Sequence, residues 1–211
     1  IPWRVSRARF GGVVLARVKI AITGNTGSGK STVAELLKKR GIPVLDADAM
    51  AHEIISMPEI LEKIKAEFGP DFITSRGLVD RKRLGREVFS DPARLRRLNA
   101  IMRPKIAFMV GKAMDEAPGE FVAVDGALVF EYGLEGLFDR VVVVVSDPDE
   151  MIRRSASKTG YSEDDVRKIF SAQIPQEEKA RKAWFVIENK GSLDDLESQV
   201  DELVARLRSG E

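Results

Sequence analysis

A glycine-rich run provides the strongest chemical signal in the sequence. Residues 24–31 read GNTGSGKS and match the pattern G-x-x-x-x-G-K-[ST]. Its glycines let the backbone curl so that successive N–H groups point at phosphate oxygens, and a following helix adds the positive end of its dipole. In such a loop Lys30 reaches the β- and γ-phosphates and the Ser31 hydroxyl can ligate Mg²⁺. The predicted nucleotide-binding residues are Gly24, Asn25, Thr26, Gly27, Ser28, Gly29, Lys30, Ser31 and Thr32.

Two other classes of nucleotide-binding protein fit the sequence poorly. A dinucleotide-binding turn needs a third glycine, but Gly29 is followed by Lys-Ser-Thr. GTPases usually read the base with Asn-Lys-x-Asp, and the nearest string here, Asn189-Lys190-Gly191-Ser192, lacks the aspartate. A small-molecule kinase is therefore the favoured class, because such enzymes combine a compact phosphate-binding core with mobile insertions.

Acidic residues stand where predicted strands end, which is the edge at which ligands bind in parallel sheets. Asp48 is the candidate carboxylate beside an acceptor hydroxyl, whereas Asp46 is favoured as a helix N-cap. His52 lies four residues after Asp48, and we expect it mainly as the partner of Asp48 on one helix face. Asp125 ends a later strand and is predicted to orient Mg²⁺ or its waters, with a turn or cap role as the alternative.

A basic cluster follows the fourth predicted strand. Arg153, Arg154 and Lys158 share one short helical stretch. We predict a lid that closes these cations over the triphosphate, while a solvated basic face is the simpler alternative.

The elements that must position these residues follow from hydrophobic patterning. Short apolar runs predict five strands, at 18–23, 42–45, 120–124, 140–145 and 184–187. The first strand, the glycine-rich loop, the helix over 31–40 and the second strand form the unit of a parallel sheet. Residues 47–117 contain no convincing strand, and proline and glycine divide them into helices at 47–56, 59–68, 80–89, 92–102 and 105–117. Further helices are predicted after Pro148, after Ser162 and over 192–209.

Composition limits the possibilities further. The 211 residues include 34 Lys+Arg and 33 Asp+Glu, which is not the balance of a polybasic nucleic-acid binder. The absence of cysteine excludes disulfides and thiol catalysis and fits a reducing compartment such as the cytoplasm, and a single histidine excludes a multi-histidine metal site. No apolar run reaches the roughly 18 residues that a membrane span needs. Residues 1–17 are basic and free of acids, and we interpret them as an upstream extension or a small basic arm.

Beyond the glycine-rich loop, several strings resemble the dephospho-CoA kinase family over about residues 18–208. The more specific ones are residues 22–34 and the string 44–48 with its following Ala-His pair. Weaker similarities are found at 80–85, 88–89, 128–131 and 171–179. The resemblance implies transfer of the ATP γ-phosphate to the ribose 3′-hydroxyl of dephospho-CoA, with ATP and Mg²⁺ required.

The resemblance also implies an architecture and residue roles. It implies an α/β P-loop kinase core (18–50, 118–150 and 184–211), a helical acceptor domain (51–117) and a lid (151–183). Asp48 matches the general base, Lys30 keeps its phosphate role, and Arg154 matches a lid arginine that acts with Lys158. The implied acceptor-binding residues are Asp48, His52, Arg81 and Arg103. The implied partners are the two small substrates, with no nucleic acid or membrane, in a monomer or small homo-oligomer.

Some positions depart from the family pattern. Ala127 stands where proline is usual, Arg103 precedes Pro104 where histidine is usual, and Lys158 replaces a second lid arginine. Trp184-Phe185 stands where Ala-Asp is usual. Two alternatives therefore stay open: a P-loop kinase for another small acceptor, or a nucleotide-binding regulator that has lost turnover.

Overall fold

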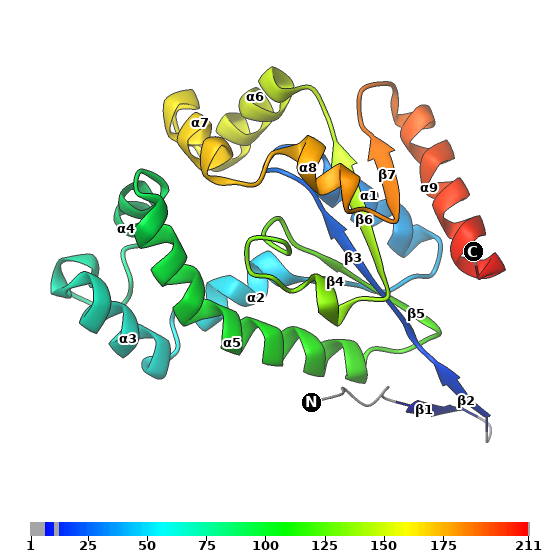
Figure 1. Cartoon of the computed structure of the whole chain (residues 1–211), viewed down its shortest axis with the longest axis horizontal. Coiled ribbons are helices and arrows are strands. Elements are labelled where there is room, and N and C mark those ends of the chain that lie inside the picture. Colours follow the sequence, from blue (N-terminus) through cyan, green and yellow to red (C-terminus); the bar gives the residue numbers. More distant parts are fainter. Residues whose placement is uncertain (1–6, 11–12, 211) are drawn as a thin grey trace.

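The computed structural model describes residues 7–10 and 13–210 and is built on a five-stranded parallel sheet (Figure 1). The strand order is β4-β5-β3-β6-β7. The predicted α/β fold and all five predicted strands are confirmed. The strands are β3 (Val18–Thr23), β4 (Val44–Asp46), β5 (Phe121–Asp125), β6 (Arg140–Val145) and β7 (Phe185–Glu188).

Helices cover both faces of this sheet. They are α1 (Lys30–Lys39), α2 (Ala47–Ile54), α3 (Pro58–Phe68), α4 (Arg81–Phe89), α5 (Pro92–Glu116), α6 (Pro148–Thr159), α7 (Glu163–Ala172), α8 (Gln176–Arg181) and α9 (Leu193–Ser209), with 3-10 turns η1 (Pro70–Phe72) and η2 (Glu135–Leu137). Helices α2 to α5 extend to one side of the sheet, and α6 and α7 lie beyond its upper end (Figure 1). No strand is formed within 47–117, as predicted, apart from one isolated bridge between Ile73 and Val79.

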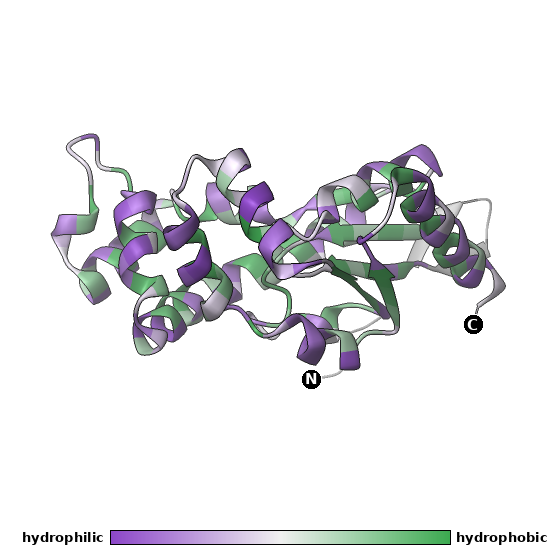
Figure 2. Ribbon diagram, turned by 90° about the horizontal axis from the view of Figure 1, so that it is seen from above, coloured by the Kyte–Doolittle hydropathy of each residue, from purple (hydrophilic) through white to green (hydrophobic). Residues whose placement is uncertain are grey.

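Side chains of the central strand β3 point alternately to the two faces of the sheet, so the core has two layers. Ile20 and Ile22 pack with α1 and α9, whereas Ala21 packs with the helices of the 47–117 segment. The valines of β6 from Val142 to Val144 are fully buried, as expected for a strand covered on both faces. The strands are hydrophobic along their length, and the surrounding helices alternate between hydrophobic and hydrophilic faces (Figure 2).

The prediction of a helix break at Pro104 is wrong. Helix α5 runs unbroken from Pro92 to Glu116 with Pro104 inside it. Proline removes one backbone hydrogen bond and crowds the preceding turn. The helix continues because its apolar side chains, at i, i+4 spacing, stay buried in the shared core; these are Met102, Ile106, Val110 and Met114.

The N-terminal segment contains two further strands, which the sequence analysis did not predict. Strands β1 (Arg7–Phe10) and β2 (Val13–Ala16) pair antiparallel as a separate two-stranded sheet. Residues 1–6 and 11–12 lie outside the described residues, so the predicted arm is described only in part. Arg17, which we assigned to that arm, is buried and donates to the carbonyls of Met114, Asp115 and Gly119. It thereby caps the carboxyl end of α5 and belongs to the packed core.

None of the helices within 7–10 and 13–210 combines the length and the apolar character needed to span a membrane.

Candidate active site

The glycine-rich loop lies between β3 and α1, with the geometry that its sequence predicts. Gly27 and Gly29 adopt positive φ values of 78° and 97°, which side chains other than glycine rarely adopt. A Cβ at Gly27 would also collide with the backbone carbonyl of Met151, so α6 packs directly on the loop. Because α1 begins at Lys30, the backbone amides of the loop lie at the N-terminus of this helix, which is the positive end of its dipole.

Lys30 is held inside this loop. Its side chain is buried, and its Nζ donates to the Asn25 carbonyl at 3.1 Å. Burial lowers the pKa of Lys30, while the negative charges of Asp125 and Asp48 oppose that shift. The structure therefore brings the phosphate-loop lysine and two of the predicted carboxylates into one electrostatic cluster.

Asp48 lies on the rim of this cluster. It is exposed to solvent, so a substrate hydroxyl can reach it, and its Oδ1 accepts a hydrogen bond from the Ala127 amide at 3.3 Å. The protein packed around the carboxyl raises its pKa, against the opposing effects of Lys30 and the Ala127 amide. A carboxylate with a raised pKa is suited to accept a proton near neutral pH.

The helix that carries Asp48 begins as predicted. Asp46 is the N-cap of α2, and its Oδ1 accepts from the Ala49 amide at 2.8 Å. His52 lies one turn after Asp48 on the same helix. The pKa of His52 is lowered by burial and by the positive charge of Arg81, whereas Asp48 acts in the opposite direction. The structure thus gathers Asp48, His52 and Arg81 from α2 and the start of α4.

Asp125 is the last residue of β5 and is partly buried. Its Oδ1 is buried and has no hydrogen-bond partner among the described residues. Burial raises the pKa of Asp125 to about 6, with Asp48 and Asp46 acting in the same direction and Lys30 opposing them. A buried carboxylate oxygen without a partner and the hydroxyl of Ser31 are hard oxygen donors of the kind that Mg²⁺ prefers. Across the described residues no cluster of three or more acidic or histidine ligands could hold a metal by itself, so phosphate and water would have to complete the coordination.

The predicted lid residues take different positions. Lys158 of α6 reaches the loop, where its Nζ contacts the Ser31 hydroxyl at 3.4 Å. Arg154 instead points to the end of β6, where it donates to the Ser146 hydroxyl at 3.3 Å and pairs with Glu150 at 3.6 Å. The structure therefore places Lys158, but not Arg154, in contact with the phosphate loop.

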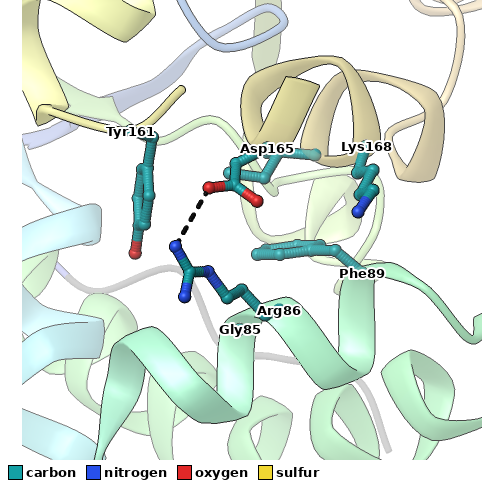
Figure 3. Close-up of a pocket in the computed structure, with 7 residues that line it drawn as sticks. Gly85, Arg86, Phe89, Tyr161, Asp165 and Lys168 are labelled. Atoms are coloured by element: carbon teal, nitrogen blue, oxygen red, sulfur yellow. Dashed lines mark hydrogen bonds and ion pairs between the residues drawn. The ribbon is translucent and has the colours of Figure 1, made fainter. Parts of the chain in front are cut away.

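Helices α4 and α7 meet across a small pocket (Figure 3). Arg86 of α4 pairs with Asp165 of α7 at 3.3 Å, while Phe89 and Tyr161 line the walls. No residue of the glycine-rich loop lines this pocket, and neither does Asp48.

Arg103 is one of the predicted acceptor-binding residues. It donates to the Gly133 carbonyl at 3.1 Å and so joins α5 to the segment after β5.

The sequence analysis assigned no individual role to several polar residues that support the site. Gln173 accepts from the Thr26 amide at 3.0 Å, and Asn189 donates to the Ser28 carbonyl at 2.9 Å. Lys179 and Glu131 form a buried ion pair at 2.8 Å. The similarity at 128–131 and 171–179 pointed to three of these positions, but single polar residues do not reveal their contacts in the sequence.

Comparison with known proteins assigns the chain to a family. A sequence model described as dephospho-CoA kinase matches residues 18–195. A dephospho-CoA kinase of Thermus thermophilus is 40% identical over 191 residues, covering 90% of this chain and 92% of the relative. One from Corynebacterium glutamicum is 39% identical over 197 residues, covering 91% and 98%.

Solved structures agree with that assignment. TT1252 from Thermus thermophilus has a TM-score of 0.75 at 39% identity, with 90% of this chain and 98% of that chain covered. Dephospho-CoA kinase from Campylobacter jejuni has a TM-score of 0.64 at 28% identity, with 91% and 98% covered. Shikimate kinase from Acinetobacter baumannii, with a TM-score of 0.53 at 14% identity over 93% and 96% of the two chains, shares the fold alone. Both the sequence and the fold place this chain in the dephospho-CoA kinase family.

Proposed function

We propose that this protein transfers the γ-phosphoryl group of ATP to the ribose 3′-hydroxyl of dephospho-CoA, which yields CoA and ADP and completes coenzyme A synthesis. The observation that carries this proposal is the meeting of Asp48 and Asp125 with Lys30 at the carboxyl edge of the sheet, in a chain of this family. A phosphate-binding lysine beside an accessible carboxylate is the minimum that phosphoryl transfer to a hydroxyl requires.

In this mechanism the loop amides and Lys30 hold the β- and γ-phosphates. Asp48 orients the 3′-hydroxyl and takes its proton while the hydroxyl oxygen bonds to the γ-phosphorus. The bond between the γ-phosphorus and the β–γ bridging oxygen breaks, and ADP leaves with the bonding electrons. Lys158 and Arg154 neutralise the charge on the transferring group. Arg154 must turn away from Ser146 to do so, as lid closure would allow.

Mg²⁺ is the metal that the site's donors fit, and Ser31 and Asp125 would hold it together with phosphate oxygens and water. When bound, it neutralises phosphate charge. Asp125 ends β5 opposite Ile22 of β3, the strand that leads to the loop carrying Lys30, so its carboxylate would be available to a cation at the same edge of the sheet as Lys30.

We also propose a division of the chain that matches this function. We assign the nucleotide to the core of 18–50, 118–150 and 184–211, the acceptor to the helices of 51–117, and closure to the lid of 151–183. Within the acceptor region, His52, Arg81 and Arg103 are positively charged or able to become so, which suits an anionic substrate. We further propose a cytoplasmic protein, either a monomer or a small homo-oligomer, that acts on small molecules and binds neither nucleic acid nor membrane.

An acceptor panel tests the proposal against its alternatives. The purified protein is given Mg-ATP with dephospho-CoA, shikimate, gluconate or adenosine, and ADP and phosphorylated acceptor are quantified by chromatography. We expect rapid ADP formation with dephospho-CoA alone. ADP formation with a different acceptor would support another kinase, and ATP binding without turnover on any acceptor would support a regulator.

A further inference from the structure

A buried ion pair joins helix α8, in the last part of the 151–183 segment, to the loop after β5. Lys179 of α8 is completely buried, and Glu131 is 6% exposed. Glu131 Oε1 accepts from Lys179 and from the Ile174 amide at 3.0 Å, while Oε2 is buried without a partner among the described residues. Removing two charges from water is costly, and a well-packed apolar pair would often stabilise a fold as well or better. The pair therefore calls for an explanation besides stability.

The contacts of Lys179 lead to the catalytic edge. Besides Glu131, its Nζ donates to the Ala127 carbonyl at 3.2 Å. The amide of the same residue, Ala127, donates to Asp48, and the Thr23 hydroxyl contacts the Ala127 carbonyl at 3.5 Å. Ala127 is thus fixed by Lys179 on its carbonyl side and meets Asp48 on its amide side.

Neighbouring residues of the same segment hold the other loops of this edge. Gln173 accepts from Thr26 of the phosphate loop, as described above, and Gln176 exchanges two hydrogen bonds with Ser146 after β6. Residues 173–179 therefore contact all three loops that follow β3, β5 and β6. Within this segment, Ile174 and Lys179 both bond to the loop after β5, and Lys179 is the one whose side chain bonds to Ala127, the residue that donates to Asp48.

We propose that Lys179, held in place by Glu131, is a positioning residue that fixes Ala127 against Asp48 and so sets the place of the base relative to the phosphate loop. This inference rests on the proposed function of Asp48. It predicts a specific kinetic signature: loss of Lys179 lowers kcat, while ATP affinity is kept because Gln173, not Lys179, contacts the phosphate loop.

The main test is the double variant Lys179→Met/Glu131→Gln. Removing both charges avoids leaving one of them buried without its partner, and glutamine can still accept from the Ile174 amide. We expect kcat to fall about 10- to 100-fold, the penalty typical of a misplaced catalytic group, with the ATP dissociation constant unchanged within about twofold. The matched control is Lys182→Met/Glu178→Gln, which removes an exposed pair at the same helix and should leave kcat unchanged. Unchanged kcat in the main variant would overturn the proposal.

A cycle with Asp48→Asn separates positioning from general structural damage. If Lys179 acts through Asp48, adding the double substitution to Asp48→Asn should lower kcat by no more than about twofold further. The same large loss in both backgrounds would overturn the positioning role and leave the proposed function standing. Full activity of Asp48→Asn would instead remove the role of Asp48 itself. If the double variant does not fold, Glu131→Gln alone must show the same dependence on Asp48, and independence from Asp48 would contradict the proposal.

Discussion

Asp46 lies directly opposite Asp125 in the register of the parallel strands β4 and β5. The two carboxylates end neighbouring strands, yet they have different surroundings: Asp46 is exposed and caps α2, whereas Asp125 is partly buried and has an oxygen without a partner. The pair shows how one edge of the sheet supplies both the start of the helix that carries Asp48 and a carboxylate suited to a cation.

The cap predicts a modest stability effect. Asp46→Ala removes the acceptor of the Ala49 amide and should lower the free energy of unfolding by about 1 kcal/mol. Urea unfolding measures this loss. Asp80→Ala, which removes the N-cap of α4, is the matched control and should cost a similar amount without moving Asp48. A loss no larger than the experimental error for Asp46→Ala would argue against the cap.

Asp48 should matter to turnover much more than to nucleotide binding. Asp48→Asn keeps the shape of the side chain but cannot accept the hydroxyl proton, so we expect kcat to fall by about 100-fold or more. The ATP dissociation constant, measured by calorimetry, should stay within about twofold. The opposite pattern, in which ATP binding is lost and turnover per bound ATP is kept, would be incompatible with a base beside the acceptor.

Lys30 should be needed for both steps. Lys30→Met removes the charge that we propose holds the phosphates, so ATP binding and turnover should both fall steeply, by about 100-fold or more in kcat/KM. Folding should survive, because methionine fills the volume without the cost of a buried charge. Lys38→Met on the exposed face of the same helix is the control. An active Lys30→Met enzyme would show that the loop is not the phosphate site.

Asp125 predicts a pH dependence of stability. Burial raises the pKa of Asp125 to about 6 from an ordinary value of 3.8, so the folded protein binds the proton more tightly than the unfolded chain. Stability relative to Asp125→Asn should therefore fall as pH rises from about 4 to about 6, by on the order of 3 kcal/mol. Thermal unfolding of both proteins across this range, without nucleotide or metal, measures the difference.

The same comparison includes a metal test. If the ionised Asp125 carboxylate holds Mg²⁺ as proposed, Mg-ATP should raise the wild-type unfolding temperature at neutral pH more than that of Asp125→Asn. If the unfolding temperatures of wild type and Asp125→Asn instead change in parallel with pH, that result would contradict the raised pKa of Asp125. Equal stabilisation of both proteins by Mg-ATP would contradict metal binding by Asp125.

Much of the fold could be predicted because its signals are local. The valines of β6 predict a strand buried on both faces, and the glycines of residues 24–31 have few uses other than the observed curled loop. The N-cap role of Asp46 could likewise be predicted, because it depends only on the residues next to it in the sequence. The unbroken α5 was not predicted, because the packing that carries the helix through Pro104 comes from residues distant in sequence.

The candidate site likewise has residues that the sequence could predict and contacts that it could not. The strand ends placed Lys30, Asp48 and Asp125 in one cluster, as expected from parallel topology. The contacts of Gln173 with Thr26 and of Lys179 with Ala127 span 147 and 52 residues, and no periodicity or spacing reports such pairs. The direction of Arg154 toward the Ser146 hydroxyl also depends on where α6 lies relative to the end of β6, which local sequence does not report.

The most direct test of the central claim follows the chemistry of a single turnover. Enzyme in excess over dephospho-CoA is mixed with Mg-ATP carrying a labelled γ-phosphate, and the position of the label is read by mass spectrometry, with Asp48→Asn as the control. We predict that wild type forms CoA labelled at the 3′-phosphate in equal amount with ADP, and that Asp48→Asn binds ATP but forms almost none. ADP without labelled CoA, or label at another position, would contradict the account.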